Sequence, residues 1–317
     1  MTQRPLVAGI GISNPQRVMF PDARASKLDV ARFYERIARW ILPHVKGRPL
    51  TLVRCPKGTS GDCFYMKHSK VWAPSALRRV QIQEKTKIGD YLIADTPQAI
   101  VALVQMDVLE IHTWNTRYEH VELPDRLVFD IDPGDDVSWA QVADAGKLVR
   151  KILRSVGLES FAKTTGGRGL HVVVPLTPDP DADWKVCLEF SQVIAEAIER
   201  GNPELYTTAF ARAGRERKLL IDYLRNNRTN TSVAAFSTRA RTGATVSMPI
   251  AWHELRAALS PDRWTILTAE KRLRSMKVDP WAKYWTTRQS LTETMRSVPP
   301  ERERHAAAAP RPPRARR

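Results

Sequence analysis

The sequence predicts an α/β fold, because apolar strand-like segments alternate with amphipathic helical segments along the chain. Strands are expected at residues 125–134, 170–176 and 218–224, and the second of these is rich in valine. Between them, apolar residues recur at helical spacing after Ser138 and after Asp183, which predicts two helices. The alternation predicts an α/β core formed by the middle of the chain.

Capping residues mark where the expected helices begin. Ser26 is followed three residues later by Asp29, and Ser138 is followed by Gln141, which is the spacing of a capping box. The Asp183 carboxylate can accept hydrogen bonds from the first backbone N–H groups of a further helix. Each of these residues therefore predicts a helix start.

Other segments complete the expected organisation. A helix is expected over residues 26–41, and Leu50 to Arg54 reads as a short strand, whereas residues 92–104 mix both patterns and are left unassigned. Residues 296–317 are rich in Pro and Arg and are expected to form a disordered tail. The preceding 1–295 are expected to form one catalytic domain.

Composition narrows the class of protein. Hydrophobic residues make up 43% of the chain, enough for a core. No run of about 18 apolar residues appears, so no membrane span is expected. The N-terminus lacks the apolar core of a signal peptide. We therefore expect a cytoplasmic, nucleoid-associated protein.

The charge points to a polyanionic partner. Fifty Lys and Arg against 34 Asp and Glu give a formal net charge of +16. From Arg296 onward, seven Arg and two Glu give the tail +5, so +11 remains without it. A surface this basic usually binds nucleic acid. Charge alone would also suit a ribosome- or membrane-surface protein, so it sets no mechanism.

The three cysteines, Cys55, Cys63 and Cys187, give no strong signal. No two have Cys-x-x-Cys spacing, and only His68 could join Cys55 and Cys63 around zinc. Reduced thiols in a reducing compartment are therefore expected rather than a zinc site.

Two acids stand at the end of a predicted strand. Because strand side chains alternate between faces, Asp130 and Asp132 share one face. Adjacent carboxylates repel each other unless water or a cation separates them, and oxygen ligands suit Mg²⁺ or Mn²⁺. The alternative is an ordinary acidic turn that includes Asp135 and Asp136.

A third acid strengthens the metal hypothesis. Asp222 is the single acid of an otherwise apolar strand, and a buried carboxylate is costly unless it is paired or binds metal. With Asp130 and Asp132 it would supply the carboxylates of a two-metal site, whose ions lie about 4 Å apart. We therefore predict that the three carboxylates converge on one spot. A surface-facing Asp222 is the alternative.

A glycine-rich turn lies between these strands, in Lys163-Thr-Thr-Gly-Gly-Arg-Gly-Leu-His171. Glycines let backbone N–H groups approach a phosphate, and Lys163 and Arg168 add charge. The order of a Walker loop is absent, and such a turn alone is weak evidence. Farther on, polar and basic residues could grip phosphates or form a solvated loop. These are Arg225, Arg228, Ser237, Thr238, Arg239 and Arg241.

Five strings in this order resemble the polymerase domain of bacterial DNA ligase D, in the archaeo-eukaryotic primase superfamily. They are Arg48-Pro-Leu-Thr-Leu-Val-Arg-Cys-Pro56, Leu109-Glu-Ile-His112, Leu127-Val-Phe-Asp-Ile-Asp-Pro-Gly134, Lys163-Thr-Thr-Gly-Gly-Arg-Gly-Leu-His171 and Ile221-Asp-Tyr-Leu-Arg-Asn226. The resemblance runs from about residue 8 to about residue 295.

The resemblance implies a palm sheet related to the RNA-recognition fold, packed against a second α/β layer. It implies a primase-like DNA or RNA polymerase that extends primers and fills gaps during non-homologous end joining. Its substrates would be NTP or dNTP and primer–template DNA with a 5′-phosphate at the end. A separate ligase and a DNA-end-binding protein would be further partners. Two Mn²⁺ or Mg²⁺ ions would be bound by Asp130, Asp132 and Asp222.

The resemblance also implies roles for individual residues. His112 would lie near the nucleotide sugar. The triphosphate would be held by the turn, through Thr165, Gly166, Arg168 and His171. Further contacts to the nucleotide or primer would come from Arg215, Arg225, Arg239 and Arg241.

DNA contacts follow from the same resemblance. The pair Phe64 and Tyr65 looks like an aromatic pair that stacks on template bases. Near the N-terminus, a downstream 5′-phosphate would be bound by Asn14, Arg17 and Lys27.

Two features depart from the family pattern. Relatives commonly have Ser and Lys where Thr165 and Arg168 stand, which could alter nucleotide preference. No ligase or phosphoesterase domain lies within the 317 residues, so we expect a stand-alone enzyme or part of a longer chain. The competing hypotheses are a primase that starts chains without a primer, a non-catalytic DNA-end-binding module and a metal-dependent nuclease, for which no water-activating base stands out.

Overall fold

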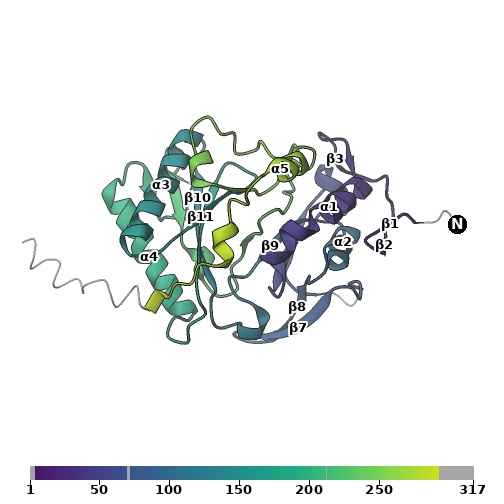
Figure 1. The fold of residues 1–317 in the computed structure, drawn as a ribbon, viewed down its shortest axis with the longest axis horizontal. Helices are drawn as coiled ribbons and strands as arrows, with labels where there is room; N and C mark the ends of the chain where they lie inside the picture. The colour runs from purple at the N-terminus through teal and green to yellow at the C-terminus, as the bar shows by residue number, and fades with distance from the viewer. Residues whose placement is uncertain (1–3, 70–71, 212, 293–317) are drawn as a thin grey trace, which may run out of the picture.

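The computed structural model describes residues 4–69, 72–211 and 213–292. Two β-sheets, each with its own helices, lie side by side (Figure 1). This arrangement confirms the predicted α/β class with a second layer. The predicted tail, residues 296–317, lies outside the described residues.

The larger sheet carries most of the predicted strands. Its order is β13 (Tyr206–Thr207), β14 (Leu219–Asp222), β10 (Arg126–Pro133), β12 (Leu170–Pro175), β11 (Phe161–Thr164) and β16 (Pro249–Ile250). The central strand β10 runs antiparallel to both neighbours, and β13 runs parallel to β14. Helices α3 (Trp139–Ser155) and α4 (Trp184–Gly201) pack on the sheet (Figure 1).

The smaller sheet has the order β15 (Ser232–Val233), β9 (Val108–Thr113), β5 (Leu50–Arg54) and β6 (Phe64–Met66). Helix α2 (Pro97–Gln105) packs on β9 and on α1 (Lys27–Val45), and α1 also contacts α5 (Ala269–Ser275). Strand β6 forms one edge of this sheet.

Short elements complete the fold. In the part of the chain that the structure describes, three two-stranded ribbons pair β1 (Leu6–Val7) with β2 (Ile10–Gly11), β3 (Val18–Phe20) with β4 (Ala25–Ser26), and β7 (Arg78–Gln83) with β8 (Ile88–Ile93). The single-turn 3₁₀ helices are η1 (Gly58–Ser60), η2 (Tyr118–His120), η3 (Leu224–Asn226), η4 (Trp252–Glu254) and η5 (Ala282–Trp285).

The predicted caps are confirmed. Ser26 and Ser138 both form capping boxes, and the Asp183 side chain accepts from two backbone N–H groups at the start of α4. Helix α1 runs four residues past the expected end, to Val45. The unassigned stretch contains the end of β8 and then α2, whose first turn is capped by Thr96.

Alternation along β10 separates the core from the functional face. Leu127, Phe129 and Ile131 are fully buried in the hydrophobic core. Helix α3 covers this face closely, since a side chain at Gly146 would collide with Leu170, the cross-strand partner of Ile131. The acids of β10 therefore point to the other face of the sheet.

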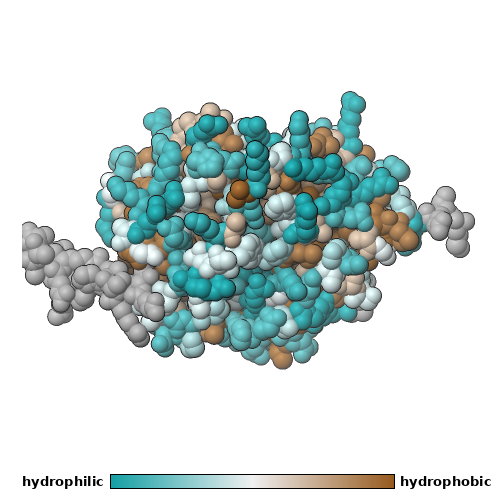
Figure 2. Space-filling model, viewed as in Figure 1, coloured by the Kyte–Doolittle hydropathy of each residue, from teal (hydrophilic) through white to brown (hydrophobic). Residues whose placement is uncertain are grey.

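The surface agrees with the composition. Figure 2 shows a mainly hydrophilic face, with hydrophobic residues gathered at the end nearest β1 and β2. No helix in the described ranges has both the length and the apolar character to cross a lipid bilayer.

The expectation of reduced thiols is wrong for two cysteines. Cys55 and Cys63 form a disulfide across the loop that joins β5 to β6. Cys187 is a buried free thiol in α4. The pairing depends on the return of β6 beside β5, which places the two cysteines close together.

Candidate active site

Strand pairing brings four polar side chains into one row across the larger sheet. Asp130 is paired with Asp222 on β14 and with His171 on β12, and His171 is paired with Lys163 on β11. Directly opposed residues of antiparallel strands point to the same face. Asp132 lies two residues farther along β10 and shares this face. The three acids therefore lie on one face, and Asp222 is buried rather than surface-facing.

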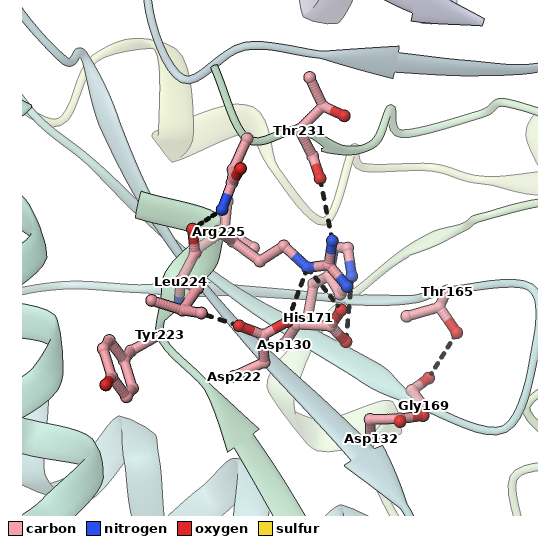
Figure 3. A network of polar contacts seen from close by, with 12 residues as sticks. Asp130, Asp132, Thr165, Gly169, His171, Asp222, Tyr223, Leu224, Arg225 and Thr231 are labelled. Carbon is pink, nitrogen blue, oxygen red and sulfur yellow. Dashed lines mark hydrogen bonds and ion pairs between the residues drawn. The ribbon is translucent and has the colours of Figure 1, made fainter. Parts of the chain in front are cut away.

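The chain after β14 places a cation over this row. The side-chain amide of Asn226 exchanges two hydrogen bonds with the Val128 backbone, at 2.7 and 2.9 Å, and so anchors η3 against β10. This places Arg225 so that its Nε lies 3.1 Å from Asp130 Oδ2 and 3.0 Å from Asp222 Oδ2. Figure 3 shows Arg225 reaching to both carboxylates and to the Thr231 carbonyl.

Asp132 lies apart from the Arg225 network (Figure 3). Its carboxylate is half exposed and pairs with Arg215 at 3.1 Å. Within the described residues, no three Asp, Glu, His or Cys side chains are grouped as a ready metal site. The binding of shared divalent ions by the three carboxylates stays a prediction. The acids share a face, but arginines occupy the positions between and beside them.

The pKa values of the three acids are shifted in different directions by their surroundings. Burial raises the pKa of Asp222 to about 6. Burial and the nearby Asp130 also raise the pKa of Asp132. Burial acts in the same direction on Asp130, but the neighbouring His171 and Arg225 outweigh it and hold its pKa well below the usual range. For Asp132 and Asp222, the neighbouring cations therefore do not fully offset the cost of ionisation.

The surroundings of His171 favour the neutral form of its imidazole. Burial and the Lys163 charge lower the pKa of His171 to about 4. Its Nε2 lies 3.3 Å from Asp130 Oδ1 and can donate to that carboxylate, while its buried Nδ1 has no hydrogen-bond partner among the described residues. The lowered pKa values of both groups favour a neutral imidazole beside an ionised Asp130.

The row opens into a cleft of about 740 Å³ between the two sheets. Among the predicted site residues, its lining includes Tyr65, His112, Asp130, Asp132, Thr165, Arg168, His171, Arg215, Arg225, Arg239 and Arg241. Gly166 and Asp222 are not part of the lining. Sequence reasoning missed the opposite wall, which Thr231, Ser232 and Val233 contribute from and beside β15. No local signal in the sequence marks these three residues.

The glycine-rich turn is fixed by its own hydrogen bonds. Thr165 Oγ1 donates to the Gly169 carbonyl and accepts from the Gly167 N–H. Gly166 has a φ of +70°, and a Cβ there would lie 2.8 Å from Arg239 Cγ, so only glycine fits. Arg168 donates to the Gly134 carbonyl at 2.6 Å, which ties the turn to the end of β10.

The smaller sheet contributes a buried acid that sequence reasoning did not single out. Glu110 accepts from His112 Nε2 and from the Ala240 N–H, both at 2.8 Å, and pairs with Arg239 Nε at 3.1 Å. Burial opposes its ionisation, but His112 and Arg239 lower the pKa of Glu110 to about 2. Arg239 also donates to the Thr165 carbonyl at 2.7 Å and so links the two walls. The sequence signal that could have identified Glu110 is its position as the single acid in the apolar strand β9.

The aromatic pair of β6 is divided between the two faces of the strand, and its stacking on template bases stays a prediction. Tyr65 is opposite Val53 and faces the cleft, where its ring centroid lies 6.0 Å from that of His112. Phe64 is opposite Arg54 and so lies on the other face of the strand. Phe64 does not line the cleft.

The predicted phosphate-binding residues form a cluster away from the cleft lining. Lys27 and Arg17 both pair with Asp107, at 2.7 and 3.1 Å, and Arg54 lies 3.7 Å from the same carboxylate. Lys27 is almost fully buried, and burial lowers its pKa. Asn14 joins through its backbone carbonyl, which accepts from the Arg17 N–H. Their role in phosphate binding stays a prediction.

Known proteins share this architecture. The LigD primase-polymerase domain family matches residues 26–281 of the chain. The chain belongs to this family. The multifunctional non-homologous end joining protein LigD of Pseudomonas aeruginosa is 37% identical over 297 residues, which cover 92% of this chain and 35% of that protein. The LigD protein of Mycolicibacterium smegmatis is 32% identical over 248 residues, 78% of this chain and 32% of that protein.

The LigD family assignment extends to solved structures. The polymerase domain of Mycobacterium tuberculosis ligase D, in complex with DNA, matches with a TM-score of 0.78 and 29% identity, covering 84% of this chain and 94% of that chain. The chain spans about a third of the length of the curated LigD relatives. The resemblance seen in the five strings is therefore confirmed as family membership.

Proposed function

We propose that this chain is a template-directed polymerase that extends primers and fills gaps at broken DNA ends before ligation. The observation that carries the proposal is the row of acids on one face of the larger sheet, at the base of a basic cleft of about 740 Å³. Membership of the LigD primase-polymerase family and the DNA-bound relative support the same reaction.

The acids fit a pair of divalent ions. Carboxylate oxygens suit Mg²⁺ and Mn²⁺, and Asp130, Asp132 and Asp222 lie on adjacent strand positions of one face. Arg225 and Arg215 pair with these acids, so the proposal requires the two guanidinium groups to turn aside when metal and nucleotide bind. Both arginines reach the acids with long side chains and already line the cleft, where a triphosphate could take them as partners.

The reaction joins a primer 3′-oxygen to the α-phosphorus of a nucleoside triphosphate and releases pyrophosphate. Two bound divalent ions would favour ionisation of the 3′-hydroxyl and stabilise charge on the leaving group. The side chains of Arg215, Arg239 and Arg241 would hold the triphosphate by charge-assisted hydrogen bonds. His171 would orient Asp130 through its Nε2 proton. Most of the protein's contribution is therefore positioning.

A second binding site would hold the DNA end. Arg17, Lys27 and Arg54 share the single carboxylate Asp107 in the ion pairs of the described residues, which leaves positive charge for a phosphate. We propose that this cluster binds the 5′-phosphate on the downstream side of a gap. A separate ligase and a DNA-end-binding protein would then complete end joining.

The test is primer extension on gapped DNA that carries a downstream 5′-phosphate, with Mg²⁺ or Mn²⁺ and with NTP or dNTP. Extension by the wild-type chain, and its loss in Asp130→Asn, is the expected result. Synthesis on a template without a primer would favour the primase hypothesis. Tight DNA binding without extension under any metal condition would favour the non-catalytic binding module.

A further inference from the structure

A second cavity lies at the end of β10 that is farther from the acids. It has a volume of about 290 Å³ and shares no lining residue with the cleft. Asp125 lies five residues before Asp130, so the cavity is roughly 16 Å from the acids along the strand. We call it the Asp125 pocket. The polar and aromatic residues of its lining include Arg48, Arg117, His120, Asp125, Trp285 and Arg288.

Buried positive charge lies at the base of the Asp125 pocket. Arg48 is 2% exposed and binds Asp125 through both Nη atoms at 2.6 Å, while its buried Nε has no hydrogen-bond partner among the described residues. Arg126 is also buried, and it donates to neutral oxygens of residues 113–115. Burial and the nearby Arg48 lower the pKa of Arg126 to about 10. One carboxylate therefore serves two buried guanidinium groups, which leaves positive charge without an anionic partner.

The rim of the Asp125 pocket adds further cations. Arg117 Nε lies 3.6 Å from Asp125 Oδ2, so this arginine shares the carboxylate that Arg48 already binds. Arg288 is exposed and donates to two backbone carbonyls, at 3.0 and 3.1 Å. In the described part of the chain, no carboxylate forms an ion pair with Arg288. Arginines thus outnumber acids at the base and at the rim.

A phosphate group fits this arrangement better than a carboxylate or duplex DNA. Guanidinium groups bind phosphate through charge-assisted hydrogen bonds, and its tetrahedral oxygens can accept from several directions. The arginines of the lining come from three separate segments, which hold Arg48, Arg117 and Arg288. A carboxylate accepts in one plane, and Asp125 already supplies that geometry to Arg48. A cavity of about 290 Å³ is suited to a small molecule and is too small for a duplex.

We propose that the Asp125 pocket is a second anion site, separate from the cleft, that binds the phosphate group of a small molecule. Two sources share this chemistry: free inorganic phosphate, and a nucleotide whose base would lie against the half-buried Trp285 ring. Arg48 precedes β5 of the smaller sheet, and Asp125 precedes β10 of the larger sheet. A bound phosphate would therefore link segments that enter both sheets and would stabilise their contact. The site goes beyond the polymerase proposal, because its residues lie outside the cleft.

The experiment measures the affinity for inorganic phosphate and the midpoint of thermal unfolding, Tm. It compares wild type with Arg117→Ala and Arg288→Ala, because Arg48 is too buried to replace without damage to the fold. Phosphate should raise the Tm of wild type until the site is saturated, since a ligand of the folded state stabilises it. Each rim variant should bind phosphate about tenfold more weakly, because a hydrogen bond to a charged group has at least this effect. Titration calorimetry gives the affinity, and the dependence of Tm on phosphate concentration checks it.

Controls separate this site from the cleft and from salt effects. Arg241→Ala removes a cation of the cleft instead, and it should keep the phosphate-dependent rise in Tm. Potassium chloride and potassium acetate at the same ionic strength test for screening and for carboxylate binding. A rise that is absent in wild type, that both rim variants keep in full, that Arg241→Ala abolishes, or that chloride or acetate matches would overturn the inference.

AMP distinguishes the two sources of phosphate. Tighter binding of AMP than of inorganic phosphate, with the difference lost in Trp285→Leu, would identify a nucleotide as the ligand. Equal or weaker binding of AMP would identify free phosphate. Both results support an anion site, provided that the rim variants weaken the binding.

Discussion

The two walls of the cleft treat their acids in opposite ways. On the larger sheet, burial raises the pKa of Asp222 to about 6 and also raises that of Asp132. On the smaller sheet, equally buried Glu110 has its pKa lowered to about 2, because His112, Arg239 and a backbone N–H all bind it. The acids of the larger sheet are incompletely stabilised by protein cations, so a bound metal ion could stabilise their negative charge. On the smaller sheet, Glu110 already has its ion-pair partner Arg239, which links the two sides of the cleft.

The largest expected effect concerns the acids of the larger sheet. Asp130→Ala and Asp132→Ala should lower primer extension by about 10²–10³-fold or more, because metal-ion stabilisation supplies several kcal/mol. DNA affinity should largely persist, since neither acid lies in the Asp107 cluster. Single-nucleotide incorporation and DNA binding by anisotropy measure the two properties. Full activity in either variant would remove these acids from the mechanism.

The buried ion pair of Glu110 on the smaller sheet should contribute to the stability of the fold. Glu110→Ala leaves Arg239 and His112 without their buried partner and should cost about 3 kcal/mol in the free energy of unfolding. The pKa of Glu110 is lowered on folding from 4.5 to about 2, so its contribution is present above pH 4.5 and is lost as pH falls toward 2. Urea unfolding at several pH values measures this.

A matched control is Glu189→Ala on α4, whose carboxylate is exposed and lies 3.9 Å from Lys185. Exposed pairs contribute about 0–1 kcal/mol, so the stability should hardly change. Equal losses in the free energy of unfolding for Glu110→Ala and Glu189→Ala would contradict the contrast between a buried, paired acid and an exposed surface acid.

The opposite sign is expected at Asp222. Its folded pKa of about 6 lies above the ordinary 3.8, so its ionisation costs stability above pH 6 and the cost disappears below pH 3.8. Asp222→Asn should therefore raise the free energy of unfolding at pH 7 by about 1–2 kcal/mol, less than the full shift implies because Arg225 loses a partner. The variant should lack extension activity. Thermal unfolding of wild type and Asp222→Asn at pH 7 and pH 4 measures this difference. A variant that is less stable than wild type at pH 7 would show that ionised Asp222 does not destabilise the fold.

The turn that meets both walls should affect nucleotide use. Arg168 lines the cleft but donates to the Gly134 carbonyl and pairs with exposed Asp135. We expect Arg168→Ala to raise the nucleotide KM about tenfold, since a charge-assisted contact to phosphate contributes roughly 1.5–3 kcal/mol. DNA affinity should stay constant. Steady-state kinetics with varied nucleotide measures the change, and an unaltered kcat/KM would exclude a contact to the triphosphate.

The smallest effect is expected outside the cleft. Arg17 is partly exposed within the Asp107 cluster, whereas Lys27 is buried, so Arg17→Ala is the cleaner test. Removing the downstream 5′-phosphate from gapped DNA should weaken wild-type binding a few-fold, and the difference should shrink in Arg17→Ala and at higher salt, because such contacts are screened. Gapped DNA bound equally well with and without the phosphate would mean that the cluster has another role.

The sequence by itself determined whatever depends on local periodicity. Ser26, Ser138 and Asp183 predicted helix starts because a cap uses residues within one turn. Asp130 and Asp132 were placed on one face because strand side chains alternate. The five strings identified the family because their residues keep both type and order.

Only the tertiary structure decided how distant segments meet. The register of β10 with β14 put Asp222 opposite Asp130, and η3 brought Arg225 between them. The return of β6 beside β5 closed the Cys55–Cys63 disulfide and put Phe64 and Tyr65 on different surfaces. Glu110 gained its partner Arg239 from a segment more than a hundred residues away. Such contacts depend on long-range packing, which leaves no periodic trace in the sequence.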